Sequence, residues 1–233
     1  VGYGAGLSVT TGAQNTFIGG NAGDANTTAN YNTAVGYASL GSNTTGTSNV
    51  ALGAYALDAN TTADYNTAVG SGALGANTTG AANTAVGSEA LDANTTGTRN
   101  VAMGYRALTE NTTGNNNVVL GTEAARTLTG SSNVAIGEEA MEVATSAAEN
   151  VAIGFRSGRY ITGSRNTFLG YDSSSQSGNT ASDNTGIGYD TLRQNTTGVN
   201  NVAVGSYSLD ANTTGYSNTA IGKDSLSANT TGD

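Results

Sequence analysis

The chain contains no cysteine, no histidine and no tryptophan. Without cysteine it can form no disulfide, no thiolate metal site and no cysteine nucleophile, although an extracellular location stays open. Without histidine, and without a recurring cluster of carboxylates at ligand spacing, it offers little to catalysis or to metal binding. We therefore expect a protein that is not an enzyme, binds no metal and needs no cofactor.

Basic residues and long apolar runs are also scarce. The 8 Lys and Arg against 17 Asp and Glu give a net charge of −9, which repels phosphate backbones and anionic membranes, so we expect no nucleic-acid partner. No apolar stretch approaches the roughly 18 residues of a spanning helix, so we expect no membrane insertion within this segment. The chain begins at Val1 without a signal-like segment, and we expect it to be a fragment of a longer protein.

Large apolar residues are few, because Leu, Ile, Val and Phe together make up about 16% of the chain. Composition alone would predict disorder, since ordered domains usually exceed about 20%. A strict internal repeat overrules this prediction, because stacked units need few large apolar groups when each unit buries its face on the next.

An asparagine recurs every 17 residues, with two intervals of 16 and one of 18, and a glycine stands four residues after it. We number this asparagine position 1 of the repeat. Fourteen units are present, the first and last incomplete. They predict one β-solenoid domain over residues 1–233, with regular coils at 1–117 and 184–233 and irregular coils at 118–183. The recurring residues are Asn15, Asn32, Asn49, Asn66, Asn83, Asn100, Asn117, Asn133, Asn150, Asn166, Asn184, Asn201 and Asn218.

The unit predicts an all-β fold, because it carries glycines, several β-branched residues and an Asn-Thr-Thr turn signal that do not suit a helix. We expect two short strands per unit, with reversals at the position 5 glycine and at Asn-Thr-Thr-Gly, where positive φ is accessible. Stacked asparagines are expected to form an amide ladder, and stacked threonines to exchange hydrogen bonds.

Alternation along the first strand separates positions 2 and 4 from position 3. We expect the larger residues at positions 2 and 4 to form a core column, as in Val50 with Leu52, Val101 with Met103, and Val134 with Ile136. Position 3, as in Ala51, Ala102 and Ala135, is then expected to face outward and pack against other copies of the chain. A second core column is expected from Leu40, Leu57, Leu74, Leu91, Leu108, Leu192, Leu209 and Leu226.

Two segments, Ser132-Asn133-Val134-Ala135-Ile136-Gly137 and Asn150-Val151-Ala152-Ile153-Gly154, resemble the head repeats of YadA-type trimeric autotransporter adhesins. The wider unit, with its Ala-Leu and Asn-Thr-Thr-Gly, resembles repeats of phage tail fibres. The resemblance implies a left-handed parallel β-roll, a homotrimer, exposure on a cell surface or virion, and a core role for Val134 and Ile136. The present repeat is longer than the adhesin head repeat, with the extra residues in the Asn-Thr-Thr-Gly turn.

Nine Asn-Thr-Thr sequences, from Asn26 to Asn229, match the N-glycosylation pattern. We interpret them as turn residues rather than as glycan acceptors. The stacked threonines also suggest ice binding, although adjacent threonines such as Thr95 and Thr96 point to opposite sides of an extended strand and leave a single column. The Gly-rich calcium-binding nonapeptide of other β-rolls is absent from the sequence.

The irregular coils at 118–183 carry half of the basic residues and lose both the Leu column and the Asn-Thr-Thr turn. Ala125, Met141, Gly158 and Ser174 replace the leucines. We expect a ligand-binding site here, in which tyrosines stack and arginines hydrogen-bond to a cell-surface glycan or protein receptor. The alternative is repeat decay, with the arginines paired to Glu138, Glu139 and Glu142. The candidate site residues are Arg156, Arg159, Tyr160, Arg165, Tyr171 and Asp172.

Together these features predict a structural and adhesive segment of an extracellular trimeric fibre, either a phage tail fibre or a bacterial adhesin head, that attaches to a cell-surface receptor. An ice-binding solenoid and a purely architectural extracellular filament are the alternatives.

Overall fold

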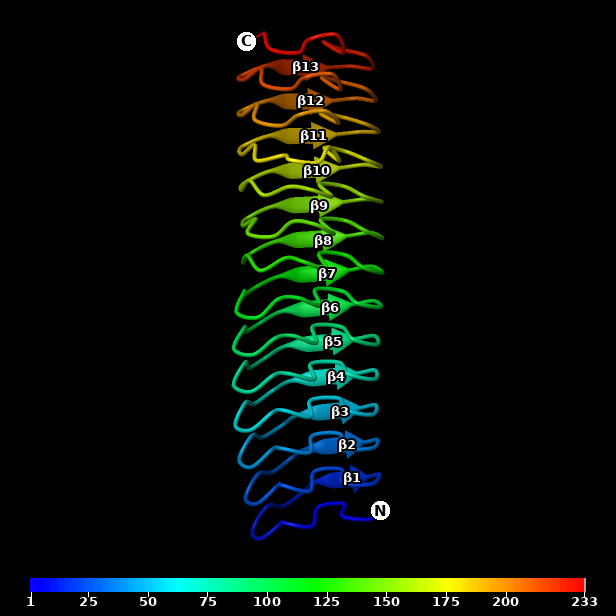
Figure 1. Ribbon diagram of the computed structural model, residues 1–233, viewed down its shortest axis with the longest axis vertical. Coiled ribbons are helices and arrows are strands. Elements are labelled where there is room, and N and C mark those ends of the chain that lie inside the picture. Colours follow the sequence, from blue (N-terminus) through cyan, green and yellow to red (C-terminus); the bar gives the residue numbers. More distant parts are fainter. Residues whose placement is uncertain (233) are drawn as a thin grey trace. The chain divides into compact units, whose positions relative to one another are not determined.

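The computed structural model describes residues 1–232. The chain forms two compact units, Val1–Asn116 and Asn117–Asp233. Each unit is a parallel β-solenoid in which every complete coil contributes one three-residue strand, and the described residues contain no helix (Figure 1). The first unit holds β1 (Thr16–Ile18), β2 (Thr33–Val35), β3 (Val50–Leu52), β4 (Thr67–Val69), β5 (Thr84–Val86) and β6 (Val101–Met103). The second holds β7 (Val118–Leu120), β8 (Val134–Ile136), β9 (Val151–Ile153), β10 (Thr167–Leu169), β11 (Thr185–Ile187), β12 (Val202–Val204) and β13 (Thr219–Ile221).

Within each unit, successive strands pair in parallel and in register with the repeat. In β3 and β4, for example, Val50 lies beside Thr67 and Ala51 beside Ala68. Equivalent residues therefore stand above one another in columns, which confirms the predicted parallel β-solenoid. The expectation of two strands per unit was wrong, because the rest of each coil consists of turns and bends.

A glycine ends every strand for two reasons that act together. The glycines after the 13 strands have φ between 119° and 142°, a conformation that costs side-chain-bearing residues dearly. A Cβ added to Gly53 would also lie only 2.4 Å from the carbonyl oxygen of Gly70 in the next coil. The column requires glycine both for its backbone angle and for the close approach of neighbouring coils.

The coil interior is lined by small and aliphatic side chains that are fully buried. Ala51, Ala102 and Ala135 at position 3 have no exposed surface, and neither do the leucines of position 9 from Leu40 to Leu209. The predicted Leu column is therefore confirmed, except that Leu226 in the last coil is 46% exposed.

The prediction that positions 2 and 4 of each strand face the interior of the coil was wrong. Leu52 and Met103 are 36% and 42% exposed, and Val50, Val101, Val134 and Ile136 are all partly exposed rather than buried. Positions 2 and 4 point outward because the Leu column lies opposite the strand and leaves room for little more than a methyl group at position 3. The alanines therefore form the core, and the larger residues form the outer surface of the sheet.

Positive φ angles also occur at residues other than glycine. Each Leu of position 9 has φ between 49° and 55°, so burial of the side chain must outweigh a left-handed strain of about 1–2 kcal/mol. The glycines of Asn-Thr-Thr-Gly, by contrast, do not have positive φ, which corrects the expectation for this turn. Space explains them instead, because a Cβ on Gly80 would lie 2.3 Å from the carbonyl oxygen of Gly97.

Two buried asparagine ladders connect neighbouring coils, of which the one at position 1 was predicted and the one at position 12 was not. At position 1, the side-chain oxygen of Asn66 accepts from the backbone N–H of Asn83 at 2.9 Å, and its Nδ2 donates to the carbonyl of Gly80 at 2.9 Å. At position 12, Nδ2 of Asn77 donates to Oδ1 of Asn60 at 3.0 Å. Each ladder satisfies polar groups that would otherwise be buried without partners.

Threonine hydroxyls add a third connection between coils. Oγ1 of Thr78 donates to the backbone carbonyl of Thr95 at 3.1 Å, and Thr95 donates in the same way to Thr112. The predicted exchange between threonine columns therefore exists, with a backbone carbonyl as the acceptor.

The irregular coils keep a filled core by trading volume between positions. Gly158 stands where regular coils have leucine, and the ring of Phe168 occupies the space, with Cδ2 3.4 Å from the place of a Cβ on Gly158. Phe168 in turn stands where regular coils have alanine and is 1% exposed. Leu128 and Ile161, both fully buried, replace the position 12 asparagine. Loss of the sequence pattern therefore does not mean loss of packing.

Candidate functional site

The charged residues of the irregular coils form two adjacent columns, at positions 7 and 10 of the repeat, which follow the strand in each coil. Arg156 follows β9 and bonds through Nε to Oε2 of Glu139 in the preceding coil, at 2.6 Å. Arg159 of the same coil contacts Glu142 at 2.6 Å and Glu139 at 3.2 Å. Arg126 also reaches Glu142, at 3.6 Å. The arginines are thus tied into one network with the glutamates.

The arginines of this network lower the pKa of Glu139. The hydrogen bond from Arg156, with added attraction from both arginines, lowers the pKa of Glu139 despite its partial burial. Glu142 is only 7% exposed, and its pairing with Arg159 offsets the desolvation of that carboxylate. The alternative prediction paired the arginines with Glu138, Glu139 and Glu142. Glu139 and Glu142 form these ion pairs in the structure.

The same arrangement exists in a regular coil of the first unit. Arg106 bonds to Glu89 at 2.6 Å, at the same repeat position as Arg156 and Glu139. The guanidinium of Arg106 lies 5.2 Å from the ring centroid of Tyr105, and that of Arg156 lies 4.6 Å from the ring centroid of Phe155. The Arg–Glu–aromatic group therefore belongs to the repeat. At position 10 the first unit carries the aspartates Asp24, Asp58 and Asp92, whereas the second unit pairs Arg159 with Glu142.

An aromatic column runs beside the charges through four consecutive coils. Its ring centroids are 5.0 Å apart for Phe155 and Tyr171, 5.4 Å for Tyr171 and Tyr189, and 5.3 Å for Tyr189 and Tyr207. Tyr171, Tyr189 and Tyr207 are each between 37% and 46% exposed. Because the first three rings stack on one another, they offer solvent mainly their edges and hydroxyl groups.

Acidic residues lie next to this column. Burial raises the pKa of Asp172, although the nearby Arg156, Arg193 and Arg159 oppose the shift. Burial also raises the pKa of Asp190, with Arg193 opposing and Asp172 and Asp210 adding repulsion. Over residues 1–232, the only buried side-chain polar atoms without a hydrogen-bond partner are Oδ1 of Asp190 and Oδ1 of Asp210.

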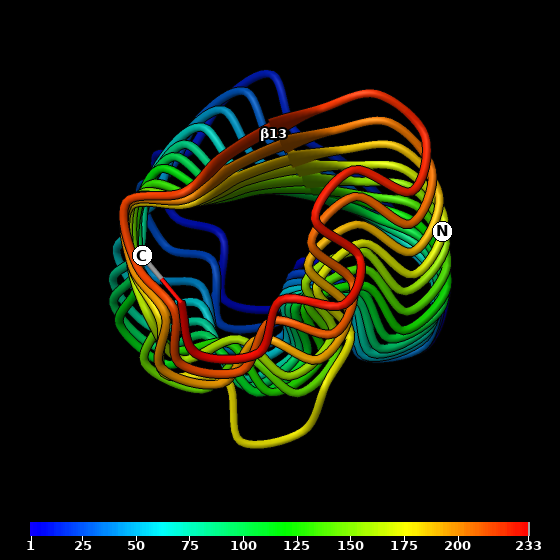
Figure 2. The ribbon, with the colours of Figure 1, turned by 90° about the horizontal axis from the view of Figure 1, so that it is seen from above.

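A loop projects from the coil that contains Asp172. It is the yellow segment that leaves the outline of the stacked coils in Figure 2, and Gln176, Ser177 and Gly178 are exposed at its tip. Its base is fixed, because Nδ2 of Asn179 donates to Oγ of Ser174 at 2.7 Å and both residues are buried. This loop accounts for the single 18-residue interval in the repeat.

The structure places five of the six predicted site residues on or beside one face of the coils and the sixth, Arg165, elsewhere. Arg156, Arg159, Tyr171 and Asp172 belong to the two charged columns and the aromatic column, which together we call the charged-aromatic face. Tyr160 lies under Arg159, with 5.0 Å between the guanidinium and the ring centroid. Sequence reasoning missed Tyr189, Tyr207, Asp190 and Arg193. For Tyr189, Asp190 and Arg193 the distance from the strand-ending glycine, which equals that of Tyr171, Asp172 and Arg159, was a usable signal, whereas Tyr207 lies one residue further from its glycine.

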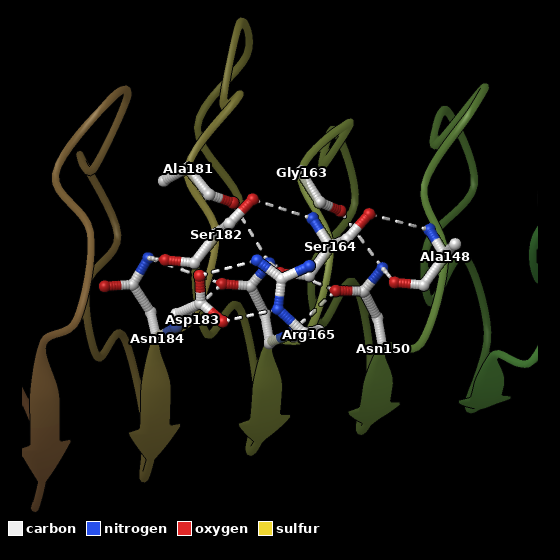
Figure 3. Close-up of polar contacts among 10 residues, drawn as sticks. Ala148, Asn150, Gly163, Ser164, Arg165, Ala181, Ser182, Asp183 and Asn184 are labelled. Atoms are coloured by element: carbon white, nitrogen blue, oxygen red, sulfur yellow. Dashed lines mark hydrogen bonds and ion pairs between the residues drawn. The ribbon is translucent and has the colours of Figure 1, made fainter.

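Arg165 does not belong to this face. It precedes β10 instead of following a strand, and it forms a two-fold hydrogen bond with Asp183 of the next coil, at 2.7 and 2.8 Å. Figure 3 shows this pair beside the hydrogen bond from the backbone N–H of Ser164 to Oγ of Ser182, at 3.0 Å. The pair raises the pKa of Arg165 and lowers that of Asp183, and it connects two coils.

The Asn-Thr-Thr sequences are poor glycan acceptors in the folded chain. Asn43, Asn60 and Asn77 have no exposed surface, and their Nδ2 atoms, to which a glycan would be attached, donate hydrogen bonds within the ladder. The adjacent threonines differ from each other, since the hydroxyl of Thr78 is bonded to the next coil while Thr79 is exposed. One exposed threonine column results.

Neither unit encloses a cavity or cleft within its described residues, and residues 1–232 hold no group of three or more acidic side chains placed to bind a metal ion. No helix in this range is long and apolar enough to cross a membrane. Comparison with known proteins found no matching family model, no matching curated protein and no matching solved structure.

Proposed function

We propose that this chain is a structural and adhesive segment of an extracellular homotrimeric fibre, with the charged-aromatic face as its contact to a cell-surface receptor. The resemblance to adhesin heads and phage tail fibres motivates the trimer and the surface location. A solenoid whose coils are joined by strand pairing and two asparagine ladders suits a load-bearing rod. The proposal includes no catalytic activity.

The observation that carries the adhesive role is the contrast between the two units. The regular coils of the first unit repeat one pattern, whereas the second unit combines a four-ring aromatic column, an arginine–glutamate pair at position 10 and a projecting loop in adjacent coils. Exposed tyrosine hydroxyls beside paired charges suit the recognition of a hydroxyl-rich surface glycan.

Binding of the purified chain to a glycan array and to intact cells tests the adhesive role. Tyr171→Ala and Arg156→Ala are expected to reduce binding at least tenfold. Tyr37→Ala and Arg106→Ala are the matched controls, because they remove the same side chains from the same repeat positions in the first unit, and they are expected to bind like the unchanged chain. Equal binding by all four variants, with equal thermal midpoints, would contradict a receptor site on this face.

A purely architectural filament is the second candidate, and the pairing of the arginines favours it. Arg156, Arg159 and Arg165 all have carboxylate partners within the chain, so structural cohesion alone accounts for them. This candidate predicts no binding of cells or glycans by the unchanged chain. Ice binding is separated from both by a thermal hysteresis assay, and absence of hysteresis at high concentration removes it.

A further inference from the structure

The outer surface of the sheet is unusual in composition. Its side chains are the first and third residues of each strand, which we call the strand face. In all 13 strands these residues are Thr or Val at the first place and Ile, Val, Leu or Met at the third. The chain has 25 charged residues, and none of them lies on the strand face.

The strand face is open to solvent in the single chain. No side chain on it is buried, and Ile18, Leu52, Met103, Val118 and Ile187 are between 36% and 45% exposed. A sheet that has one face toward water normally carries polar residues there. A contiguous exposed apolar strip is instead typical of a surface that is covered in the working assembly.

Charge and spacing both favour other copies of this chain as the cover. Two chains with a net charge of −9 repel each other across most of their surfaces, but not across a face without charge. Each copy also presents the same ladder of aliphatic groups at the strand spacing of about 4.8 Å. A second copy therefore matches the ladder along its length, which a partner without this repeat does not.

The size of the face indicates how the copies meet. Seven three-residue strands give about 30 Å by 10 Å, or roughly 300 Å² in one unit, whereas stable interfaces bury about 800 Å² per partner. A threefold arrangement increases the contact, because each sheet then packs against two others around the axis.

We infer that the strand face is the surface through which copies of this chain associate, with positions 2 and 4 packed around the assembly axis. This inference rests on the homotrimer of the proposed function and replaces the expectation that the alanines of position 3 meet other copies. Because those alanines lie inside the coil, they have no access to a neighbouring chain.

The test is the solution mass of the full chain and of two double variants, measured by light scattering over a range of concentrations. Val69→Lys with Ile153→Lys places one charge on the strand face of each unit. Thr62→Lys with Thr197→Lys adds the same charges at exposed threonines elsewhere on the coils. Circular dichroism checks that both variants keep the β-fold.

The unchanged chain and the threonine variant are expected to have three times the mass of one chain, and the strand-face variant the mass of one chain. A single-chain mass for the unchanged protein at all concentrations would overturn the inference, as would a strand-face variant that still assembles. A dimer that the strand-face variant abolishes would support the strand face while contradicting the trimer of the proposed function.

Discussion

The core of the irregular coils makes a sharp prediction about Gly158. This glycine stands where eight other coils have leucine, and its φ of 59° is close to the values of those leucines. A Cβ at this place would have ordinary contacts, at 3.4 Å from Cβ of Ala152, 3.4 Å from Cδ2 of Phe168 and 3.5 Å from Cγ2 of Ile161. Three further carbon atoms of a leucine would meet the ring of Phe168.

Gly158→Leu is therefore expected to destabilise the chain although it restores the repeat consensus. Overpacking of a filled core costs about 1–3 kcal/mol, and left-handed backbone at a residue with a Cβ adds about 1 kcal/mol. Phe168→Ala alone is expected to cost about 3–5 kcal/mol, because it leaves a cavity where a fully buried ring stood. Each single change breaks one half of the volume exchange.

Combined, the two changes place Leu and Ala where regular coils have them. The double variant is expected to lose less free energy of unfolding than the two single variants lose together, by at least about 2 kcal/mol. Urea unfolding followed by circular dichroism measures the three losses, and hydrogen exchange in the coils around β9 and β10 shows whether they are local. Gly158→Ala is the control, since its single added carbon fits the contact distances.

The reasoning fails if Gly158→Leu is as stable as the unchanged chain, or if the two losses simply add. Either result would mean that the ring of Phe168 does not fill the space of the missing leucine, and that the core of the irregular coils is loose.

Two further changes test the polar interior. Asn66→Ala is expected to cost about 1–3 kcal/mol, because it leaves the N–H of Asn83 buried without a partner, while the carbonyl of Gly80 keeps its hydrogen bond from Asn77. The exposed Thr79→Ala, as control, should change the unfolding midpoint little, and equal losses would refute the ladder. Burial, with repulsion from Glu89, raises the pKa of Asp92 above 3.8, although the N–H of Gly75 opposes this. The charged form is therefore disfavoured in the folded chain, so Asp92→Asn should increase stability at pH 7 by less than about 1 kcal/mol. This gain should vanish as the pH falls below 3.8, and a loss at pH 7 in urea unfolding would contradict it.

The repeat predicted the stacking, the register and the Leu column, because a 17-residue period with one aliphatic residue at a fixed place leaves few other ways to bury it. The asparagine ladder of position 1 followed from the same period, whereas the ladder of position 12 was not predicted, because its asparagines were interpreted only as turn residues. The sequence also located part of the charged-aromatic face, since Arg156, Arg159 and Tyr171 lie in residues 118–183, where the spacing and the Leu column change. Tyr189 and Tyr207 lie in regular coils beyond that segment.

Alternation alone could not predict which side of each strand faces the interior of the coil. Alternation separates Ala51 from Val50 and Leu52, but it does not say which side is inside. Size suggested the larger residues, and the geometry of the coil decided otherwise, because the leucine across the coil sets the space left for position 3. Phe168 illustrates this, since its ring at position 3 occupies the space beside Gly158, which stands at position 9 of the preceding coil.

The separation of Arg165 from the other site residues has a similar origin. Arg159 and Arg165 are six residues apart in the sequence, but β10 begins two residues after Arg165, whereas Arg159 lies in the turns that follow β9. In a coil of 16 or 17 residues, six residues cover about a third of the circumference. Clusters in such a sequence therefore indicate a shared face only when their repeat positions agree, as they do for Phe155, Tyr171 and Tyr189.

The inward position of the alanines and the outward position of the larger strand residues explain both the thin core and the proposed assembly. A regular coil, which has room for little more than alanine beneath its strand, must put its β-branched and larger aliphatic residues outside, because strand formation still needs them. The chain thus folds around small residues and leaves its larger apolar groups on an uncharged surface. Covering that surface with other copies would add hydrophobic burial without enlarging the coil, which gives a fibre built of 17-residue units a physical reason to be oligomeric.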